Sequence, residues 1–273
     1  MSFLCSILYN SSVLKQVSIT ACYAFFPLSE AELPALREEL LNFGKERGMK
    51  GLVLLASEGI NATVCGSAQT IAEWKQRITA LDGSIIFKDS AANQLVFCRW
   101  LVKIKREIVQ LKDLSIQPAG MHRHLTPEEW HNMQTKEDVI VIDARNNYEV
   151  AIGKFRGAID PGIRRFHEFP AYLKRSKIPK NKKVMLYCTG GIRCEKALLA
   201  MEREGFHDVY QLQGGILAYL EKYPEENFEG ECFVFDHRVA VDQHLQPSKK
   251  FTLCPRCGDP SATPVCTSCA VSA

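Results

Sequence analysis

The chain has 273 residues, 46% of them hydrophobic and 24% charged, which is ordinary for a globular protein of two or three domains. Its formal net charge of +3 is too small to indicate a nucleic-acid-binding protein, so only local basic patches can support that function. No apolar run is long enough to cross a membrane, so we expect no membrane partner.

The eleven cysteines are many for a chain of this length. Cys22, Cys65 and Cys98 lie in apolar runs and are interpreted as small buried residues in a reducing compartment. The first residues, "MSFLCSILYNSSVLKQVSI", lack the basic start and the cleavage site of a signal peptide. We therefore expect a cytoplasmic protein and leave its oligomeric state open.

Residues 18–111 have the pattern of an α+β domain. A strand over residues 18–26 precedes a helical segment, for which Ser29 is the expected N-cap and Gly48 the stop. The segments that follow read as two strands, a helix and further strand-like runs: "KGLVLLASEGINATVCGS", "AQTIAEWKQRITALDG", "IIFKDS" and "VFCRWLVKIKREIVQL". The order β-α-β-β-α-β predicts a ferredoxin-like (acylphosphatase-like) sandwich, with two helices over an antiparallel sheet.

A second domain is predicted over residues 120–225. Thr126, Pro127 and Glu129 make a good helix start near its beginning. Three short apolar strands follow, separated by helical segments: "VIVIDAR" (139–145), "KVMLYC" (183–188) and "DVYQLQGG" (208–215). Continuous apolar runs that alternate with helices indicate a parallel sheet covered on both faces.

Cys188 follows the second of these strands, and ligands of parallel α/β sheets bind at the carboxyl ends of strands. The glycines of the loop 189–192 allow its backbone N–H groups to turn inward. The helix that begins near Arg193 points its positive end at the same place. Both effects stabilise a thiolate, so Cys188 is predicted to be a nucleophile with a lowered pKa. The alternative is a buried structural cysteine beside a glycine turn.

The length of this loop separates two chemistries. Cysteine phosphatases place arginine six positions after the nucleophile, whereas here Arg193 comes at the fifth position and Cys194 at the sixth. A tighter loop suits a sulfur atom carried as a persulfide, and it resembles the rhodanese loop. "VIVIDAR" with "YEVAIGKFRGAI", and "VYQLQGGILAY", resemble the opening and the close of a rhodanese domain. Cys194 either resolves an oxidised Cys188 or faces the core, and we favour the core position.

The C-terminal region 229–273 has a hairpin pattern, "ECFVFDHRVAVDQHL", followed by a tail with little apolar content. Such a tail needs a cross-link, such as a metal ion or a disulfide, to be stable. Four cysteines in two C-x2-C pairs with eight residues between them suit tetrahedral zinc: Cys254, Cys257, Cys266 and Cys269. A disulfide-linked or redox-active tail is the alternative. His237 and His244 are possible alternative ligands, but surface histidines are the simpler interpretation.

Residues 161–183 form a basic segment with a single acid, Glu168. Its eight cations are Arg164, Arg165, Lys174, Arg175, Lys177, Lys180, Lys182 and Lys183. A second basic group comprises Lys103, Lys105, Arg106 and Lys112. Basic runs are mostly solvated faces, yet this segment directly precedes the strand of Cys188 and can collect a polyanionic substrate such as RNA. Lys180, Lys182, Lys183, Arg164 and Arg165 are the candidate substrate-binding residues.

The order of these parts resembles the bacterial rhodanese-domain family of tRNA uridine-34 hydroxylases. The likeness covers nearly the whole chain from about residue 18, and its motifs are "ASEGINATV", "KIKREIV", "CTGGIRCEKA", "GECFVFDHRVAVD" and the paired cysteines. The resemblance implies oxygen-dependent conversion of wobble uridine to 5-hydroxyuridine in tRNA. It also implies that Cys188 is the active-site cysteine, at a persulfide-type position, and that molecular oxygen is a co-substrate.

Two other functions stay open at this point. The chain could be a rhodanese-type sulfurtransferase that moves persulfide sulfur to a small thiol or into tRNA thiolation. It could also be a non-catalytic RNA-binding adaptor, although an intact Cys188 and Arg193 argue against that. The residues by themselves indicate a thiolate enzyme with a sulfur-transfer-like loop, and hydroxylation rests on the resemblance.

Overall fold

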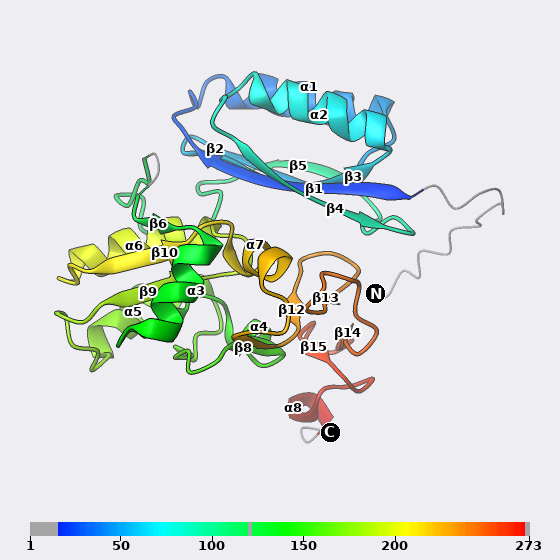
Figure 1. The fold of residues 1–273 in the computed structure, drawn as a ribbon. Coiled ribbons are helices and arrows are strands. Elements are labelled where there is room, and N and C mark those ends of the chain that lie inside the picture. The colour runs from blue at the N-terminus through cyan, green and yellow to red at the C-terminus, as the bar shows by residue number, and fades with distance from the viewer. Residues whose placement is uncertain (1–15, 120–121, 271–273) are drawn as a thin grey trace. The chain divides into compact units, whose positions relative to one another are not determined.

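The computed structural model describes residues 16–119 and 122–270. The chain divides into two compact units, residues 1–108 and residues 109–273, whose helices and strands are drawn in Figure 1. Residues 1–15, where no signal peptide is expected, lie outside the described residues, as does position 120, the expected start of the second domain. No helix of the described residues combines the length and the apolar character that a membrane span requires.

The first unit is a five-stranded sheet with two helices on one face (Figure 1). Its elements are β1 (Val17–Phe25), α1 (Leu33–Glu46), β2 (Lys50–Ala56), β3 (Gly59–Gly66), α2 (Ala68–Thr79), β4 (Ile86–Ala92) and β5 (Trp100–Ile104). The strand order is β4-β1-β3-β2-β5, and β5 runs parallel to β2 at the edge. The predicted ferredoxin-like sandwich is confirmed, with β5 as one additional strand.

Alternation along the strands explains where the core of this unit lies. Cys22 and Val64 face the helices and pack with Trp74 of α2, while Ile19 and Cys65 belong to a smaller cluster of buried residues. Successive side chains of a strand point to opposite faces, so one strand supplies both clusters. The helices themselves are amphipathic and bury only the stripe that touches the sheet.

The start of α1 differs from the expectation. The helix begins at Leu33 with Glu32 as its N-cap, so the prediction of Ser29 as the cap is wrong. A helix capped by Ser29 would place Pro34 in its second turn, where proline has no N–H for the carbonyl four residues earlier. The helix therefore starts where proline falls in the first turn. Gly48 follows the helix with a φ of +65°, as a C-terminal stop requires.

The cysteines of this unit differ in exposure. Cys22 and Cys65 are buried, as expected for small apolar residues in strands. Cys98 is exposed, so the expectation that it is buried is wrong. It lies in the connection between β4 and β5 and not in a strand, so no sheet face covers it.

The second unit contains a parallel four-stranded sheet in the order β6-β10-β9-β7. Its elements are β6 (His124–Leu125), α3 (Pro127–Lys136), β7 (Ile140–Asp143), α4 (Asn147–Val150), β8 (Gly153–Phe155), α5 (Phe169–Arg175), β9 (Val184–Tyr187), α6 (Ile192–Arg203), β10 (Val209–Leu212) and α7 (Gly215–Lys222). The predicted parallel sheet is confirmed. Thr126 caps α3 and makes the predicted reciprocal capping box with Glu129.

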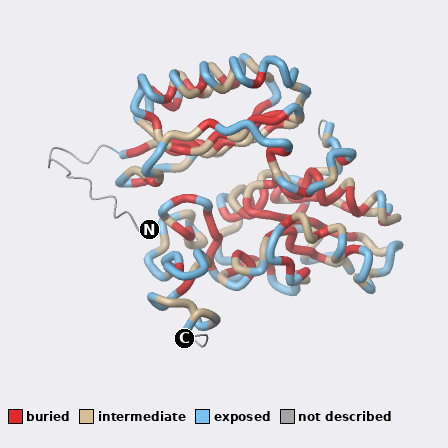
Figure 2. The backbone as a smooth tube through the Cα atoms, turned by 180° about the vertical axis from the view of Figure 1, so that it is seen from behind, coloured by how far each residue is buried: buried red, intermediate tan, exposed pale blue. Residues whose placement is uncertain are grey.

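Helices cover both faces of this sheet, and the residues of β9 divide between them. Val184 and Leu186 pack in one core cluster with residues of α5 and α6. Met185 and Tyr187 pack in the other cluster with residues of α3 and α7. All four residues of β9 are therefore buried (Figure 2). A parallel strand covered on both faces needs apolar residues throughout, which explains the continuous apolar run in the sequence.

The C-terminal region of the second unit consists of small paired strands and one short helix. They are β11 (Phe228–Gly230), β12 (Cys232–Phe233), β13 (Ala240–Val241), β14 (Thr252–Leu253), β15 (Pro260–Ser261) and α8 (Thr267–Ala270). The predicted hairpin is present, because β12 pairs antiparallel with β13. β11 pairs with β8, which fixes the start of this region to the sheet domain.

Candidate active site

The loop between β9 and α6 turns its carbonyl groups away from Cys188 and its N–H groups toward it. The carbonyl oxygen of Cys188 accepts a hydrogen bond from Ile216 N at 3.0 Å, and that of Thr189 accepts one from Leu217 N at 3.2 Å. Gly191 N donates to the Cys188 Sγ at 3.1 Å. The N–H groups of the first turn of α7 thus bind the loop carbonyls, and the N–H groups of the loop are left to donate to the sulfur.

Two glycines make this arrangement possible. Gly191 has a φ of +102°, which a residue with a side chain rarely adopts. A Cβ on Gly215 would lie 2.5 Å from the carbonyl oxygen of Cys188 and 2.6 Å from that of Thr189. Any side chain at this position would therefore push α7 away from the loop.

The pKa of Cys188 is lowered from 9.0 to about 5. Burial is the largest influence and opposes ionisation, because the sulfur has no exposed surface. A hydrogen bond from the Cys194 thiol, the positive charge of Arg193 and the N–H groups of Arg193 and Gly191 together outweigh burial. Such a sulfur is a thiolate at neutral pH, which is the nucleophilic form.

Cys194 is fully buried in the core cluster that contains Cys188. Burial raises its pKa well above the ordinary value, and the hydrogen bond to Cys188 adds to this effect. Cys194 therefore keeps its proton while Cys188 loses one. Cys194 thus occupies the predicted core position and also contacts the reactive sulfur of Cys188.

The side chain of Arg193 binds Glu149 rather than open solvent. Its Nη1 donates to Glu149 Oε2 at 2.6 Å, and its Nη2 donates to Oε1 at 2.8 Å. Thr189 Oγ1 completes the group, since it donates to Glu149 and accepts from Arg193, both at 3.3 Å. Glu149 is fully buried, so the two charges balance each other inside the protein. Glu149 was not among the residues predicted from the sequence.

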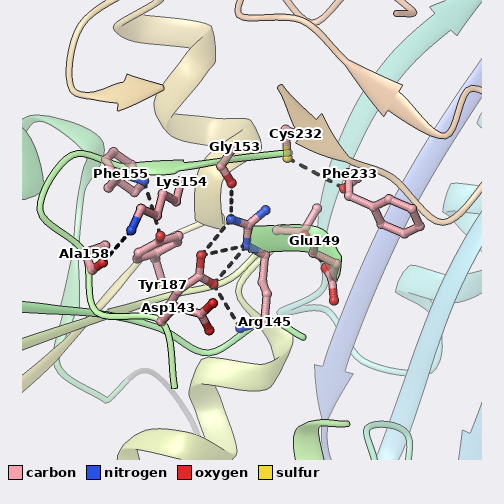
Figure 3. A network of polar contacts seen from close by, with 12 residues as sticks. Asp143, Arg145, Glu149, Gly153, Lys154, Phe155, Ala158, Tyr187, Cys232 and Phe233 are labelled. Atoms are coloured by element: carbon pink, nitrogen blue, oxygen red, sulfur yellow. Dashed lines mark hydrogen bonds and ion pairs between the residues drawn. The ribbon is translucent and has the colours of Figure 1, made fainter. Parts of the chain in front are cut away.

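A second buried ion pair lies at the end of the neighbouring strand (Figure 3). Arg145 Nε donates to Asp143 Oδ1 at 2.9 Å, and its Nη2 donates to Asp143 Oδ2 and to the Gly153 carbonyl, each at 2.6 Å. The Tyr187 hydroxyl accepts from Phe155 N at 3.2 Å. These buried contacts join the carboxyl ends of β7 and β9 to β8, so they rigidify the part of the sheet next to Cys188.

The candidate substrate-binding cations fall into two groups at opposite ends of the sheet. The carbonyl oxygen of Ile163 accepts a hydrogen bond at 2.8 Å from the N–H of Asn147, the first residue of α4, which also contains Glu149. Arg164 and Arg165 directly follow Ile163. Both arginines are exposed. They lie at the edge of the sheet where the strands end, which is the edge of Cys188.

Lys180, Lys182 and Lys183 precede β9, so they lie at its amino end, and the nearest of them, Lys183, is about 16 Å of extended chain before Cys188. Each has a partner: Lys182 binds Asp138, Lys183 binds Glu137, and the Lys180 Nζ lies 3.8 Å from the centre of the Phe206 ring. Their role in substrate binding stays a prediction. Of the second basic group, Lys103, Lys105 and Arg106 are exposed on the first unit, and Lys112 is exposed on the second.

The four cysteines of the tail form one cluster. The sulfur atoms of Cys254, Cys257, Cys266 and Cys269 all lie within 4.8 Å of one another. Zn–S bonds of about 2.3 Å in a tetrahedron would separate the sulfurs by about 3.8 Å, so the donor set fits a zinc ion. Cys266 N points at the Cys254 Sγ at 3.5 Å, and Gly258 takes the positive φ of the knuckle, +82°. The cluster can therefore bind a metal.

The two histidines considered as alternative ligands are outside this cluster. His237 and His244 are both exposed, and neither belongs to the group of sulfurs. His244 Nε2 instead lies 3.1 Å from Glu225 Oε1. The interpretation as surface histidines agrees with these positions.

Two family models match this chain, one in each unit. The UPF0176 acylphosphatase-like domain matches residues 17–108, and the rhodanese-like domain matches residues 126–222. A tRNA uridine(34) hydroxylase of Bdellovibrio bacteriovorus is 46% identical over 257 residues, which cover 92% of this chain and 73% of that protein. One of Brucella ovis is 45% identical over 249 residues, 89% of this chain and 81% of that protein. The chain belongs to this family, the tRNA uridine(34) hydroxylases.

The solved structures that resemble this member of the tRNA uridine(34) hydroxylases match a smaller part of the chain than these relatives do. A rhodanese-like domain from Anabaena is 19% identical, with a TM-score of 0.34, over 40% of this chain and 80% of that one. A human single-domain sulfurtransferase is 18% identical, with a TM-score of 0.34, over 38% of this chain and 99% of that one.

The region matched by the rhodanese-like model contains Cys188, Arg193 and Glu149. The hairpin of β12 and β13 and the four-cysteine cluster lie beyond both matched regions. The relatives, by contrast, align with about nine-tenths of the chain. The tRNA uridine(34) hydroxylases therefore share more with this chain than a rhodanese domain.

Proposed function

We propose that this chain hydroxylates uridine-34 of tRNA at C5 of the uracil ring, with Cys188 as the reacting residue and molecular oxygen as co-substrate. The observation that carries the proposal is the 46% identity to a tRNA uridine(34) hydroxylase along 92% of the chain. The lowered pKa of Cys188 supports it, because a thiolate stabilised by backbone donors is the form that an enzyme nucleophile needs.

The net reaction replaces the hydrogen at C5 by a hydroxyl group whose oxygen comes from O₂, and the other oxygen atom leaves as water. Two electrons and two protons are required, and two thiols of a cellular reductant supply them as they form a disulfide. The substrate carbon is not reactive toward oxygen by itself. The protein's part is to raise the electron density at C5 and to hold the base in place.

Cys188 can do this by covalent catalysis. Its thiolate adds to C6 of the uracil, and the electron pair of the C5–C6 double bond moves toward C5 and the C4 carbonyl. C5 then bonds to one atom of O₂ and a proton gives a hydroperoxide, and the two thiols of the reductant break its O–O bond, which releases water and leaves a hydroxyl group on C5. Loss of the C5 proton expels the thiolate from C6 and restores the double bond. Gly191 N and Arg193 N stabilise the thiolate before addition and after release.

We assign the anchoring of the tRNA backbone next to this site to Arg164 and Arg165. Both are exposed and lie at the sheet edge of Cys188, where phosphate groups on either side of nucleotide 34 would pass. A tRNA substrate is consistent with a cytoplasmic location. The lysines at the opposite edge, Lys180, Lys182 and Lys183, are proposed to extend the same contact along the tRNA.

The tail is proposed to hold a structural zinc ion. Four thiolates close the coordination sphere and leave no open position, which is typical of structural and not catalytic zinc. The ion would stabilise a segment whose short strands β14 and β15 bury little apolar surface. No step of the reaction passes through it.

Mass analysis of tRNA nucleosides from cells that lack the gene tests the proposed function. Loss of 5-hydroxyuridine, restored by the wild-type gene and not by Cys188→Ala, is the expected result. The variant protein should be folded, because alanine removes only the sulfur at a position that already packs as a small residue. Unchanged 5-hydroxyuridine in the deletion strain would contradict the proposal. Loss of thiolated uridine instead would favour the sulfurtransferase suggested by the rhodanese-like loop.

A further inference from the structure

Phe235 is an exposed aromatic side chain next to the active-site loop. Among the large hydrophobic residues that are exposed in the described part of the chain, it is the only aromatic one, with 59% of its surface accessible. It belongs to the segment "GECFVFDHRVAVD", which the chemistry of Cys188 does not use. A single exposed apolar side chain is ordinary, so the contacts of Phe235 with the active-site loop, and not its exposure alone, support a role.

The ring is held by its neighbours and is not a loose surface side chain. Phe235 packs edge to face on Phe233, with ring centres 5.0 Å apart, and Phe233 packs in the same way on Tyr148 at 5.4 Å. The Arg193 guanidinium carbon lies 5.7 Å from the centre of the Phe235 ring, over its face. The ring is therefore tied to the helix of Glu149 through Tyr148 and to the loop of Cys188 through Arg193.

The backbone around Phe235 is fixed as well. Val234 N donates to the Val239 carbonyl at 2.9 Å, which closes the hairpin between β12 and β13. Asp236 makes a two-point contact with Arg238, with distances of 2.9 and 2.6 Å, directly after Phe235. A ring on a closed hairpin loses little conformational freedom when a ligand binds to it.

We propose that Phe235 stacks on the uracil of nucleotide 34 and so positions it for Cys188. This inference rests on the proposed function. Enzymes that react with a base take it out of its stack and hold it against aromatic side chains. The contact between Phe235 and Arg193 connects the stacking surface to the residue whose backbone N–H binds the Cys188 sulfur.

The competing explanation is that Phe235 only shields the buried ion pair of Arg193 and Glu149 from water. The two roles make different predictions. A shield can be any apolar side chain of similar size, and its loss would change the pKa of Cys188 through Arg193. A stacking surface must be aromatic, and its loss would change the affinity for RNA only when nucleotide 34 carries a base.

The experiment compares two anticodon stem-loops, one with uridine and one with an abasic nucleotide at position 34. The variants are Phe235→Leu, which keeps an apolar cover, and Phe235→Trp, which keeps an aromatic face. Leu114→Ala is the matched control, since Leu114 is an exposed apolar residue of the same unit with 55% of its surface accessible. Dissociation constants, hydroxylation by each variant and the pH dependence of Cys188 alkylation are measured.

We expect Phe235→Leu to weaken binding of the uridine stem-loop about 10-fold, within the range for one stacked base. The same variant should bind the abasic stem-loop as wild type does, and Phe235→Trp should stay within about 2-fold of wild type on both RNAs. The KM for the uridine stem-loop should rise in Phe235→Leu, with an unchanged pH profile of Cys188 alkylation.

Wild-type binding of the uridine stem-loop by Phe235→Leu, or an equal loss on both RNAs, would overturn the inference. Phe235→Ala removes the apolar cover: a shifted pH profile of Cys188 alkylation in Phe235→Ala that is absent in Phe235→Leu, with no difference between the RNAs in either variant, would assign the shielding role instead. Failure of the proposed function is seen separately: wild-type protein would not hydroxylate uridine, whereas the difference between the two RNAs would still be measurable.

Discussion

Arg193 and Glu149 form a two-point ion pair beside Cys188, with N···O distances of 2.6 and 2.8 Å. Glu149 thus balances the charge of Arg193 before any substrate binds, and Arg193 still lowers the pKa of Cys188 through its positive charge and its backbone N–H. Glu149 is held in turn by Thr189 from the same loop. The pair therefore joins helix α4 to the loop of Cys188 and sets the shape of that loop.

The variant Glu149→Gln should destabilise the fold strongly. A neutral glutamine cannot balance the buried charge of Arg193, so the free energy of unfolding should fall by about 3–5 kcal/mol. Glu229→Gln is the control, because Glu229 binds Arg156 at 2.9 Å with both side chains exposed, and such pairs contribute at most about 1 kcal/mol. Urea denaturation measures both. Equal losses in the two variants would contradict a structural role for the buried pair.

Cys194→Ala should raise the pKa of Cys188. The variant removes the thiol hydrogen bond that helps lower this pKa to about 5, while the contribution of Arg193 remains. In wild type the alkylation rate of Cys188 should rise through about pH 5 and be constant near neutral pH, and in the variant the rise should occur at higher pH. Mass analysis of the peptide with Cys188 after iodoacetamide treatment gives the rates.

Cys232→Ala is the matched control for that experiment. Cys232 is also a buried cysteine near Arg193, but burial raises its pKa to about 12 and it makes no contact that lowers the pKa of Cys188. Its replacement should leave the alkylation profile of Cys188 in place. A shift of the same size in Cys232→Ala and Cys194→Ala would mean that cavities in the core, and not removal of the hydrogen bond, change the pKa.

The lowered pKa of Cys188 also makes the stability of the fold depend on pH. Between pH 5 and 9 the folded protein holds the thiolate and the unfolded chain holds the thiol, so folding releases a proton. The resulting stabilisation is complete above the unfolded pKa and is lost as the pH falls toward 5. The difference in unfolding free energy between wild type and Cys188→Ala should therefore grow with pH, by up to about 1.4 kcal/mol per unit. A difference independent of pH would contradict a thiolate in the folded state.

Continuous apolar strands and the glycine loop predicted the parallel sheet, and they placed Cys188 at its carboxyl edge. These signals are local, because a strand buried on both faces needs apolar residues at every position. The partner of Arg193 is 44 residues away in the chain, and nothing local marks it. Glu149 also accepts from Asn146 N at 3.2 Å, so in the sequence it looks like an ordinary helix-capping residue.

The same limit applies to Phe235 and to the basic residues. Composition alone marks eight cations between residues 161 and 183, but only the fold separates Arg164 and Arg165 from the three lysines at the other end of the sheet. The exposure of Phe235 depends on the hairpin of β12 and β13 and could not be read from an alternating pattern. The Ser29 cap failed for a local reason, since Pro34 has a stronger effect on where α1 begins.

The purified protein is expected to contain about one zinc ion per chain. The four sulfurs of the tail are already close enough to coordinate one ion, so binding should order this segment further. Elemental analysis of protein kept under reducing conditions measures the metal, and Cys257→Ser should not retain it. Cys98→Ser is the control, because Cys98 is an exposed cysteine of the other unit. Metal-free wild type, with no uptake after addition of zinc, would contradict the site.

The affinity for tRNA should fall with salt because of the basic segment 161–183. Arg164 and Arg165, at the sheet edge of Cys188, should contribute more to this salt dependence than the lysines do. The double variant Arg164→Ala/Arg165→Ala removes two exposed cations next to the helix of Glu149, so fewer counterions are released on binding. The slope of log affinity against log salt should become less steep by about 0.7–0.9 for each phosphate that these arginines neutralise in the wild type. Alkylation of Cys188 should be unchanged, since neither arginine lowers its pKa.

The triple variant Lys180→Ala/Lys182→Ala/Lys183→Ala is the comparison. It removes more charge, but Lys182 and Lys183 already bind carboxylates, and all three precede the amino end of β9. It should also weaken tRNA binding and flatten the slope, by less than the arginine pair does. A larger effect of the lysines would move the main tRNA contact to the opposite edge of the sheet. If neither variant changed binding at any salt concentration, the segment 161–183 would be a solvated face, and the contact would have to be sought in Lys103, Lys105, Arg106 and the four-cysteine tail.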